Sequence, residues 1–153
     1  MEQLIFDTGV KEYQINDNGV LRFNPSDPNV YARFMDAMEK IQSVEDSLVA
    51  KAKEIEKSEN QEQNGAAVLR LMAEADRETK KILAEVFGEC NDFDVILGGV
   101  NLLAVASNGE RVITNFLAAI QPIMVAGAEK CAKQQADAAV AEAKLNRAQR
   151  RAQ

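Results

Sequence analysis

The chain of 153 residues contains no histidine and no tryptophan. Without histidine, the commonest general base and the commonest metal ligand of proteins are missing. Nucleophilic machinery of the Ser-His-Asp and Cys-His kinds is therefore excluded within this chain. Two cysteines are present, Cys90 and Cys131, and two thiolates alone cannot complete a zinc site. They also form no disulfide framework, so we expect free thiols in a reducing compartment.

Phosphate-binding glycine motifs are absent as well. No GxxxxGK[ST] loop occurs, and Gly98-Gly99 lacks the GxGxxG context of a dinucleotide site. Carboxylates remain, and Asp92 and Asp94 come nearest to a metal-binding pair. We interpret them as favourable negative charge at the start of a short helix that is capped by Asn91. The sequence thus predicts a non-enzymatic protein without a cofactor or a metal, and an enzyme using carboxylates alone is the least favoured alternative.

Aromatic residues make up 5% of the chain, and the net charge is −6. With so few rings the core must rely on Leu, Ile, Val, Met and Ala, which suits packed helices. Acidic residues dominate positions 1–110, whereas positions 111–153 carry more Lys and Arg than Asp and Glu. An acidic chain argues against nucleic-acid binding, and the few basic residues near the C-terminus give too thin a footprint on phosphates. We expect no nucleic-acid partner.

Long hydrophobic runs are also missing. The opening stretch MEQLIFDTGVKEY has no basic n-region and no apolar h-region, which argues against a signal peptide. Apolar runs such as Val95–Val100 are far shorter than the roughly 20 residues that cross a bilayer. These features predict a cytoplasmic protein with no membrane partner.

Strand patterns are confined to residues 1–23. Gln3–Phe6 is short and apolar, and we expect it to form a strand that ends at the turn Asp7-Thr8-Gly9. Residues 11–15 alternate polar with apolar side chains, which is typical of a half-buried strand. Asp17-Asn18-Gly19 predicts a hairpin turn, and Val20–Phe23 the returning strand.

A long amphipathic helix is predicted after this hairpin. Asp27 can cap it and Pro28 suits its first position, and we expect the helix to end near Lys57. Apolar residues recur at steps of three and four, broken at one position by Glu45. The stripe consists of Tyr31, Phe34, Met38, Ile41, Leu48, Ala52 and Ile55. This face either packs in the core of the subunit or forms a seam that docks a partner.

Further helices follow along the chain. The polar stretch 58–65 predicts a loop, and 66–87 a second helix that pairs antiparallel with the first. The apolar stretch Val100–Ala106 favours a buried helix. A third long helix should begin near Glu110, and we expect Pro122 to kink or interrupt it.

The C-terminal end differs in composition from the rest. It is rich in alanine, and after Val125 the large apolar residues are Val140 and Leu145. Such a sequence favours helix but has little with which to bury itself, so this helix either projects and frays or docks on a partner. We divide the chain into a domain at 1–125 and a helical extension at 126–153. The predicted fold is mainly α with a small N-terminal β-hairpin, a helical bundle with a projecting C-terminal helix.

The order of features resembles a family of small proteins from Gram-positive prophages and siphophages, the tail assembly chaperones that accompany the tape-measure protein. The resemblance covers residues 3–125, and the Ala-rich end departs from it. The motifs that carry it are Leu21-Arg22-Phe23-Asn24-Pro25-Ser26-Asp27-Pro28, Tyr31-Ala32-Arg33-Phe34, Phe87-Gly88, Asn91-Asp92-Phe93-Asp94 and Asn108-Gly109-Glu110-Arg111.

The resemblance implies a protein that coats the helical tape-measure protein in the bacterial host cytoplasm and helps to recruit tail-tube subunits. Helices with apolar stripes suit such a role, because client helices dock in grooves between them. We also expect self-association. Two alternatives stay open, a phage-encoded inhibitor of a host defence system and a minor structural tail or connector protein. The candidate partner-binding residues are Tyr31, Phe34, Met38, Ile41, Leu48, Ile55, Val140 and Leu145.

Overall fold

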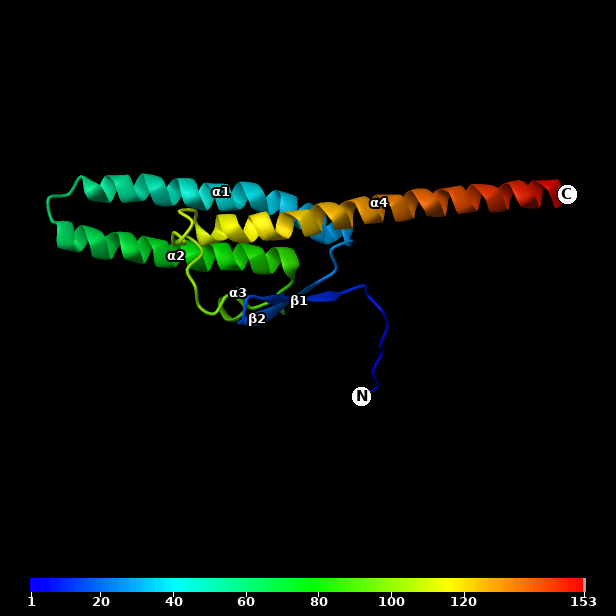
Figure 1. The fold of residues 1–153 in the computed structure, drawn as a ribbon, viewed down its shortest axis with the longest axis horizontal. Coiled ribbons are helices and arrows are strands. Elements are labelled where there is room, and N and C mark those ends of the chain that lie inside the picture. Colours follow the sequence, from blue (N-terminus) through cyan, green and yellow to red (C-terminus); the bar gives the residue numbers. More distant parts are fainter. Residues whose placement is uncertain (153) are drawn as a thin grey trace.

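The computed structural model describes residues 1–152 and shows a three-helix arrangement with a small β-hairpin beside it. Helices α1 and α2 form a long antiparallel hairpin, and α4 lies along them before it extends past their end (Figure 1). The fold is mainly α with a two-stranded sheet, as the sequence predicts. The elements are β1 (Lys11–Ile15), β2 (Gly19–Phe23), α1 (Pro28–Glu56), α2 (Gln61–Phe87), α3 (Phe93–Ile96) and α4 (Val112–Ala152).

The predicted hairpin is confirmed, and the predicted strand before it is wrong. Strands β1 and β2 pair antiparallel with Lys11 opposite Phe23 and Ile15 opposite Gly19. Residues 1–10, including Gln3–Phe6, form no strand, and every one of them is exposed. A strand requires a neighbouring backbone to pair with, and none lies beside this segment in the part of the chain that the structure describes.

The first two helices differ from prediction mainly at one boundary. Asp27 caps α1 by accepting a hydrogen bond from the backbone N–H of Asn29 at 2.9 Å, and the helix ends at Glu56 as expected. Helix α2, however, begins at Gln61, so most of the predicted loop at 58–65 is helical. Asn60 accepts a hydrogen bond from the N–H of Gln63, which allows a polar segment to start a helix.

Between α3 and α4 the chain is irregular, so the predicted helix at Val100–Ala106 is wrong. Some of its backbone groups bond to distant side chains and others to the backbone of residues 110–113, instead of forming helical bonds to residues four positions earlier. The N–H of Leu102 donates to the carboxylate of Asp76 at 2.7 Å, and the guanidinium of Arg111 donates to the carbonyl of Leu103 at 2.6 Å. Side-chain partners of this kind compete successfully with helix formation.

Helix α4 runs without interruption from Val112 to Ala152, so Pro122 does not end it. The side chain of Pro122 is exposed, while Ile120 and Met124 on either side of it are buried. Packing of the flanking turns therefore holds the helix together across the missing backbone donor. The same continuous helix crosses position 126, where the sequence suggests a domain division.

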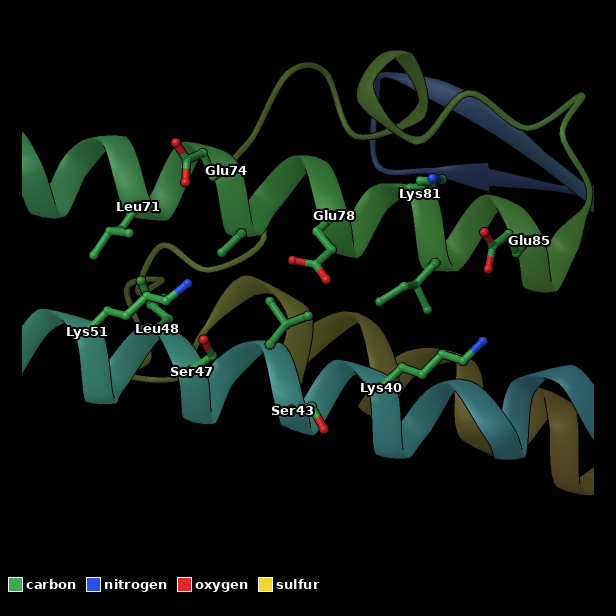
Figure 2. A pocket seen from close by; sticks show the side chains of 13 residues that line it. Lys40, Ser43, Ser47, Leu48, Lys51, Leu71, Glu74, Glu78, Lys81 and Glu85 are labelled. Atoms are coloured by element: carbon green, nitrogen blue, oxygen red, sulfur yellow. The ribbon is translucent and has the colours of Figure 1, made fainter.

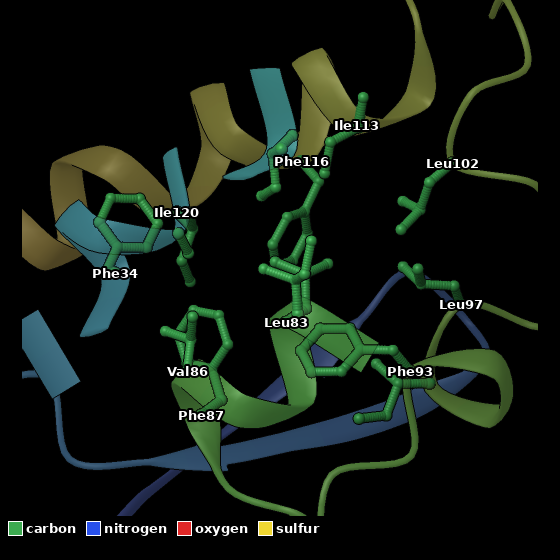
Figure 3. Close-up of a cluster of buried hydrophobic side chains, with 14 of the residues drawn as sticks. Phe34, Leu83, Val86, Phe87, Phe93, Leu97, Leu102, Ile113, Phe116 and Ile120 are labelled. Atoms are coloured by element: carbon green, nitrogen blue, oxygen red, sulfur yellow. The ribbon is translucent and has the colours of Figure 1, made fainter. Parts of the chain in front are cut away.

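The core lies where the hairpin, α1, α2, α3 and the first half of α4 meet (Figure 3). Phe87 is at its centre: its ring centroid lies 4.8 Å from that of Phe23, 5.8 Å from Phe93 and 6.4 Å from both Phe34 and Phe116. Aromatic edges and faces pack favourably at such distances. The core thus draws on every phenylalanine except Phe6, which is exposed.

Candidate interaction surfaces

Helix α4 changes character along its length. In its first half, Ile113, Phe116, Ile120 and Met124 are buried in the core. Gly127 is buried as well, because it packs so closely on Pro25 that an added Cβ would overlap the Pro25 carbonyl. From Ala132 to Ala152, by contrast, every residue is exposed. We call residues 132–152 the projecting segment, and Figure 1 shows it extending beyond the rest of the molecule.

The face of α4 that packs in the core continues along the projecting segment. Counting onward from Met124 in alternating steps of three and four leads to Gly127, Cys131, Gln134, Ala138, Ala141, Leu145, Ala148 and Ala152. Gln134 is the one polar residue in this series. We call Ala138, Ala141, Leu145 and Ala148 the α4 seam. Their spacing is that of a coiled-coil contact face, and alanine lets a partner helix approach closely.

The two candidate residues of this segment lie on different faces. Val140 and Leu145 are 54% and 60% exposed. At 3.6 residues per turn, five positions place them about 140° apart around the helix. Leu145 belongs to the α4 seam, whereas Val140 lies among the basic side chains of Lys133, Lys144 and Arg147 on another face. The segment therefore presents one small, apolar face and one basic face.

The other candidate partner-binding residues belong to α1 and face the inside of the molecule. Phe34, Ile41 and Leu48 are buried in the core. Tyr31 is partly buried and packs against the core, and Met38 and Ile55 are partly buried as well. Of the two open interpretations of this stripe, the structure therefore shows the core-facing one. Partner binding by Phe34, Ile41 and Leu48 would require the bundle to open, and Val140 and Leu145 are the candidates with exposed side chains.

A shallow groove of about 570 Å³ runs between α1 and α2 (Figure 2). Lys40 and Lys51 line it from α1, and Glu74, Glu78, Lys81 and Glu85 line it from α2, so the α1 rim is basic and the α2 rim is acidic on balance. The apolar side chains at its base offer little exposed surface, since Val44, Leu48, Ala75 and Ile82 are buried. Rims of opposite charge can orient a polar segment electrostatically. The sequence does not reveal this surface, because its two rims come from helices that meet only in the tertiary structure.

An ion network, in which Lys80 and Asp76 are buried and Asp94 is exposed, connects α2 to α3 and to the irregular segment that follows it. The ammonium of Lys80 lies 2.8 Å from Asp76 and 2.7 Å from Asp94, and Asp76 also accepts the hydrogen bond from Leu102. Burial by itself lowers the pKa of Lys80, but the hydrogen bonds and charges of the two carboxylates outweigh it and the pKa is raised. The network is therefore a structural clamp with the lysine charged.

The structure accounts for Asp92, Asp94 and Asn91 individually. Asp92, not Asn91, caps α3 by accepting hydrogen bonds from the N–H groups of Asp94 and Val95. Asp94 binds Lys80. Asn91 is buried and pairs with β2, accepting from the N–H of Arg22 at 2.8 Å and donating to its carbonyl at 2.9 Å. Within residues 1–152, no group of three His, Cys, Asp or Glu side chains is placed to hold a metal ion.

Within residues 1–152, one helix has the length and apolar composition to cross a membrane. That helix is α4, and 28% of the residues in its apolar stretch are buried in the molecule. The buried residues include Phe116, Ile120 and Met124, which pack against the other helices and the hairpin. Core helices pass the same test of length and composition, so this property is weak support for a membrane span.

A second groove, of about 540 Å³, lies between β1, the segment after α3 and α4. Apolar side chains predominate in its lining, among them Tyr13, Ile15, Val112, Phe116 and Ile123. Beyond the sheet, the first residues of the chain run away from the molecule (Figure 1). We call this groove the hairpin groove and residues 1–8 the N-terminal arm.

Comparisons of the chain with family models, with curated proteins and with solved structures give no match. The resemblance to tail assembly chaperones stays a prediction from the sequence motifs.

Proposed function

We propose that this protein is a non-enzymatic tail assembly chaperone of a phage or prophage, which binds the tape-measure protein in the bacterial cytoplasm. The observation that carries the proposal is the projecting segment, because residues 132–152 are helical but make no buried contact within the chain. A helix of alanine and charged residues gains little from remaining bare in water. Its form suits a surface that binds another helix.

The α4 seam supplies the mode of binding. A client helix with a heptad pattern can lie along Ala138, Ala141, Leu145 and Ala148 and form a short coiled coil. Because the segment continues a helix that is already anchored in the core, no nucleation cost opposes its order. The basic face around Val140 attracts acidic side chains of the client and favours their encounter.

The α1–α2 groove supports a second contact. It lies on the helical hairpin, away from the projecting segment (Figures 1 and 2). Two separated surfaces would allow one chain to hold a tape-measure helix with α4 and a tail-tube subunit with its charged rims. This arrangement fits the expected role of bringing tube subunits to the tape-measure protein.

The test is co-purification with the tape-measure protein of the same genome. The variant Ala138→Glu/Ala141→Glu places two carboxylates on the α4 seam. The matched control, Ala132→Glu/Ala139→Glu, adds the same charge on a face that is neither the seam nor the basic face around Val140. We expect the first variant to lose the client and the second to keep it. Equal binding by both variants, or no binding by the unaltered chain, would contradict the proposal.

Two further measurements separate the alternatives. A chaperone should be missing from finished particles, so its presence in purified virions at stoichiometric amounts would favour a structural tail protein. Recovery of a host nuclease instead of the tape-measure protein from infected cells would favour an inhibitor of host defence.

A further inference from the structure

The N-terminal arm carries apolar side chains that the chain itself does not cover. Leu4, Ile5 and Phe6 are 86%, 81% and 70% exposed. Three adjacent large apolar residues in water are costly and promote association. Their strand-forming pattern, unused in the single chain, points to pairing with another backbone.

The sheet beside this arm has one covered edge and one free edge. Asn91 bonds to both the N–H and the carbonyl of Arg22, so it covers the outer edge of β2. Arg22 is opposite Glu12, and backbone groups alternate in direction along an antiparallel pair. The N–H and carbonyl groups of Glu12 and Gln14 therefore point outward from β1, and no hydrogen bond within residues 1–152 pairs them with another segment.

The hairpin groove lies next to that free edge. It is lined by Tyr13 and Ile15 of β1 and, across from them, by Phe116, Ala119 and Ile123 of α4. A strand added to β1 would direct every second side chain toward the same side as Tyr13 and Ile15. The free edge thus offers backbone pairing, and the groove offers about 540 Å³ of mainly apolar space for the side chains.

We propose that the N-terminal arm of one copy adds to β1 of a second copy, with Leu4 and Phe6 in the hairpin groove. The side chain of Asn24, directly after β2, donates to the carbonyl of Thr8 at 3.1 Å, which ties the base of the arm to the end of β2 and not to the free edge of β1. Figure 1 shows it continuing past the end of the sheet. Fully extended, an arm of this length reaches roughly 25 Å, which is enough to meet a neighbour.

Mutual exchange gives a symmetric dimer, since each copy contributes one arm and receives one. Strand addition of this kind joins main-chain hydrogen bonds to side-chain pockets. The sequence predicts self-association, and this proposal assigns it to the N-terminal arm, the free edge of β1 and the hairpin groove. This inference does not depend on the identity of any client protein.

Sedimentation equilibrium of the full chain tests the proposal. The variant Leu4→Asp/Phe6→Asp should weaken dimer formation by more than about 100-fold, because two carboxylates cannot enter an apolar groove unpaired. The matched control is Met35→Asp/Leu69→Asp, which adds the same charge at two exposed apolar positions outside the lining of the groove and should dimerise like the unaltered chain. A strict monomer at all concentrations, or equal dimerisation of the arm variant and the control, would overturn the proposal.

Disulfide trapping identifies which chain fills the groove. In a background with Cys90→Ser and Cys131→Ser, we introduce Phe6→Cys and Ala119→Cys and mix two copies of different mass. The proposal requires a disulfide between copies, visible as a mixed dimer without reductant. A disulfide formed only within one chain would show that the arm folds back on its own sheet, and absence of any disulfide would also count against the exchange.

Discussion

The two halves of α4 belong to one helix but lie in opposite environments. Residues 112–127 contribute Ile113, Phe116, Ile120 and Met124 to the core, whereas residues 132–152 are exposed throughout. The two halves of α4 are helical for different reasons. The first is held by burial of apolar area, and the second extends from it with residues of high helix propensity, so that no new nucleus is needed. Helical structure alone therefore does not show that a segment belongs to the core.

The sharpest way to test this comparison is to truncate one side chain in each half. Phe116→Ala removes a ring that packs against Phe87 and Phe93, so we expect a loss of about 3–5 kcal/mol in the free energy of unfolding. Leu145→Ala in the projecting segment should change it by less than about 0.5 kcal/mol. Urea unfolding followed by circular dichroism measures both. Similar losses for the two variants would show that the projecting segment is packed.

Charged residues should show the same contrast between buried and exposed positions. Lys80→Met leaves Asp76 buried without its partner, and we expect a loss of about 3 kcal/mol, whereas the exposed Lys144→Met should be nearly neutral. The folded-state pKa of Lys80 is raised, so its stabilising contribution is complete below the ordinary lysine pKa of about 10.4 and is lost as the pH rises through the folded value.

Unfolding measured from about pH 9 upward should therefore show a steeper alkaline loss for the unaltered chain than for Lys80→Met. Burial also raises the pKa of Tyr13, and deprotonation of the tyrosine falls in the same alkaline range. Tyr13→Phe is accordingly included as a control, and the difference due to Lys80 should persist in that background. If the free energy of unfolding changed with pH in the same way for the unaltered chain and for Lys80→Met, the stabilising role of the Lys80 ion network would be contradicted.

Two glycine substitutions should change the free energy of unfolding by smaller amounts, and one of them tests the boundary between the two halves of α4. Gly127→Ala places a methyl group on the carbonyl of Pro25, which should cost about 1–3 kcal/mol. Gly65→Ala in α2 meets nothing within 4 Å and should stabilise the protein by up to about 1 kcal/mol, because alanine favours helix. Thermal unfolding of the two variants should therefore shift in opposite directions.

Removing the projecting segment altogether should have the smallest effect on the free energy of unfolding. Ending the chain at Cys131 removes residues 132–152, all of them exposed, together with Gln153, which lies outside the described residues, so the free energy of unfolding should change by less than about 0.5 kcal/mol. The proposed binding of the tape-measure protein, by contrast, should be lost. A truncated chain that unfolds more easily at equal concentration would show that the segment contributes to the core.

Local patterns predicted most of the elements. The cap at Asp27 with Pro28, the turn at Asp17-Asn18-Gly19 and the alanine-rich end each indicate a conformation that neighbouring residues decide. The start of α2 differs because of a local cap at Asn60, whereas two larger errors depend on long-range backbone pairing. Val100–Ala106 is apolar enough for a helix, but Asp76 and Arg111 bind its backbone. Gln3–Phe6 has a strand pattern, yet no strand lies beside it in the single chain.

The sequence by itself determined the class of fold, the absence of imidazole chemistry and the helical character of the alanine-rich end, because composition and short-range spacing are sufficient for these. The tertiary structure decided which apolar faces are covered. It buried Phe34, Ile41 and Leu48 of α1, brought Lys80 to Asp76 and Asp94, and left the α4 seam and the edge of β1 uncovered. Burial depends on which segments meet in space, and a periodic stripe is the same in sequence whether or not a partner covers it.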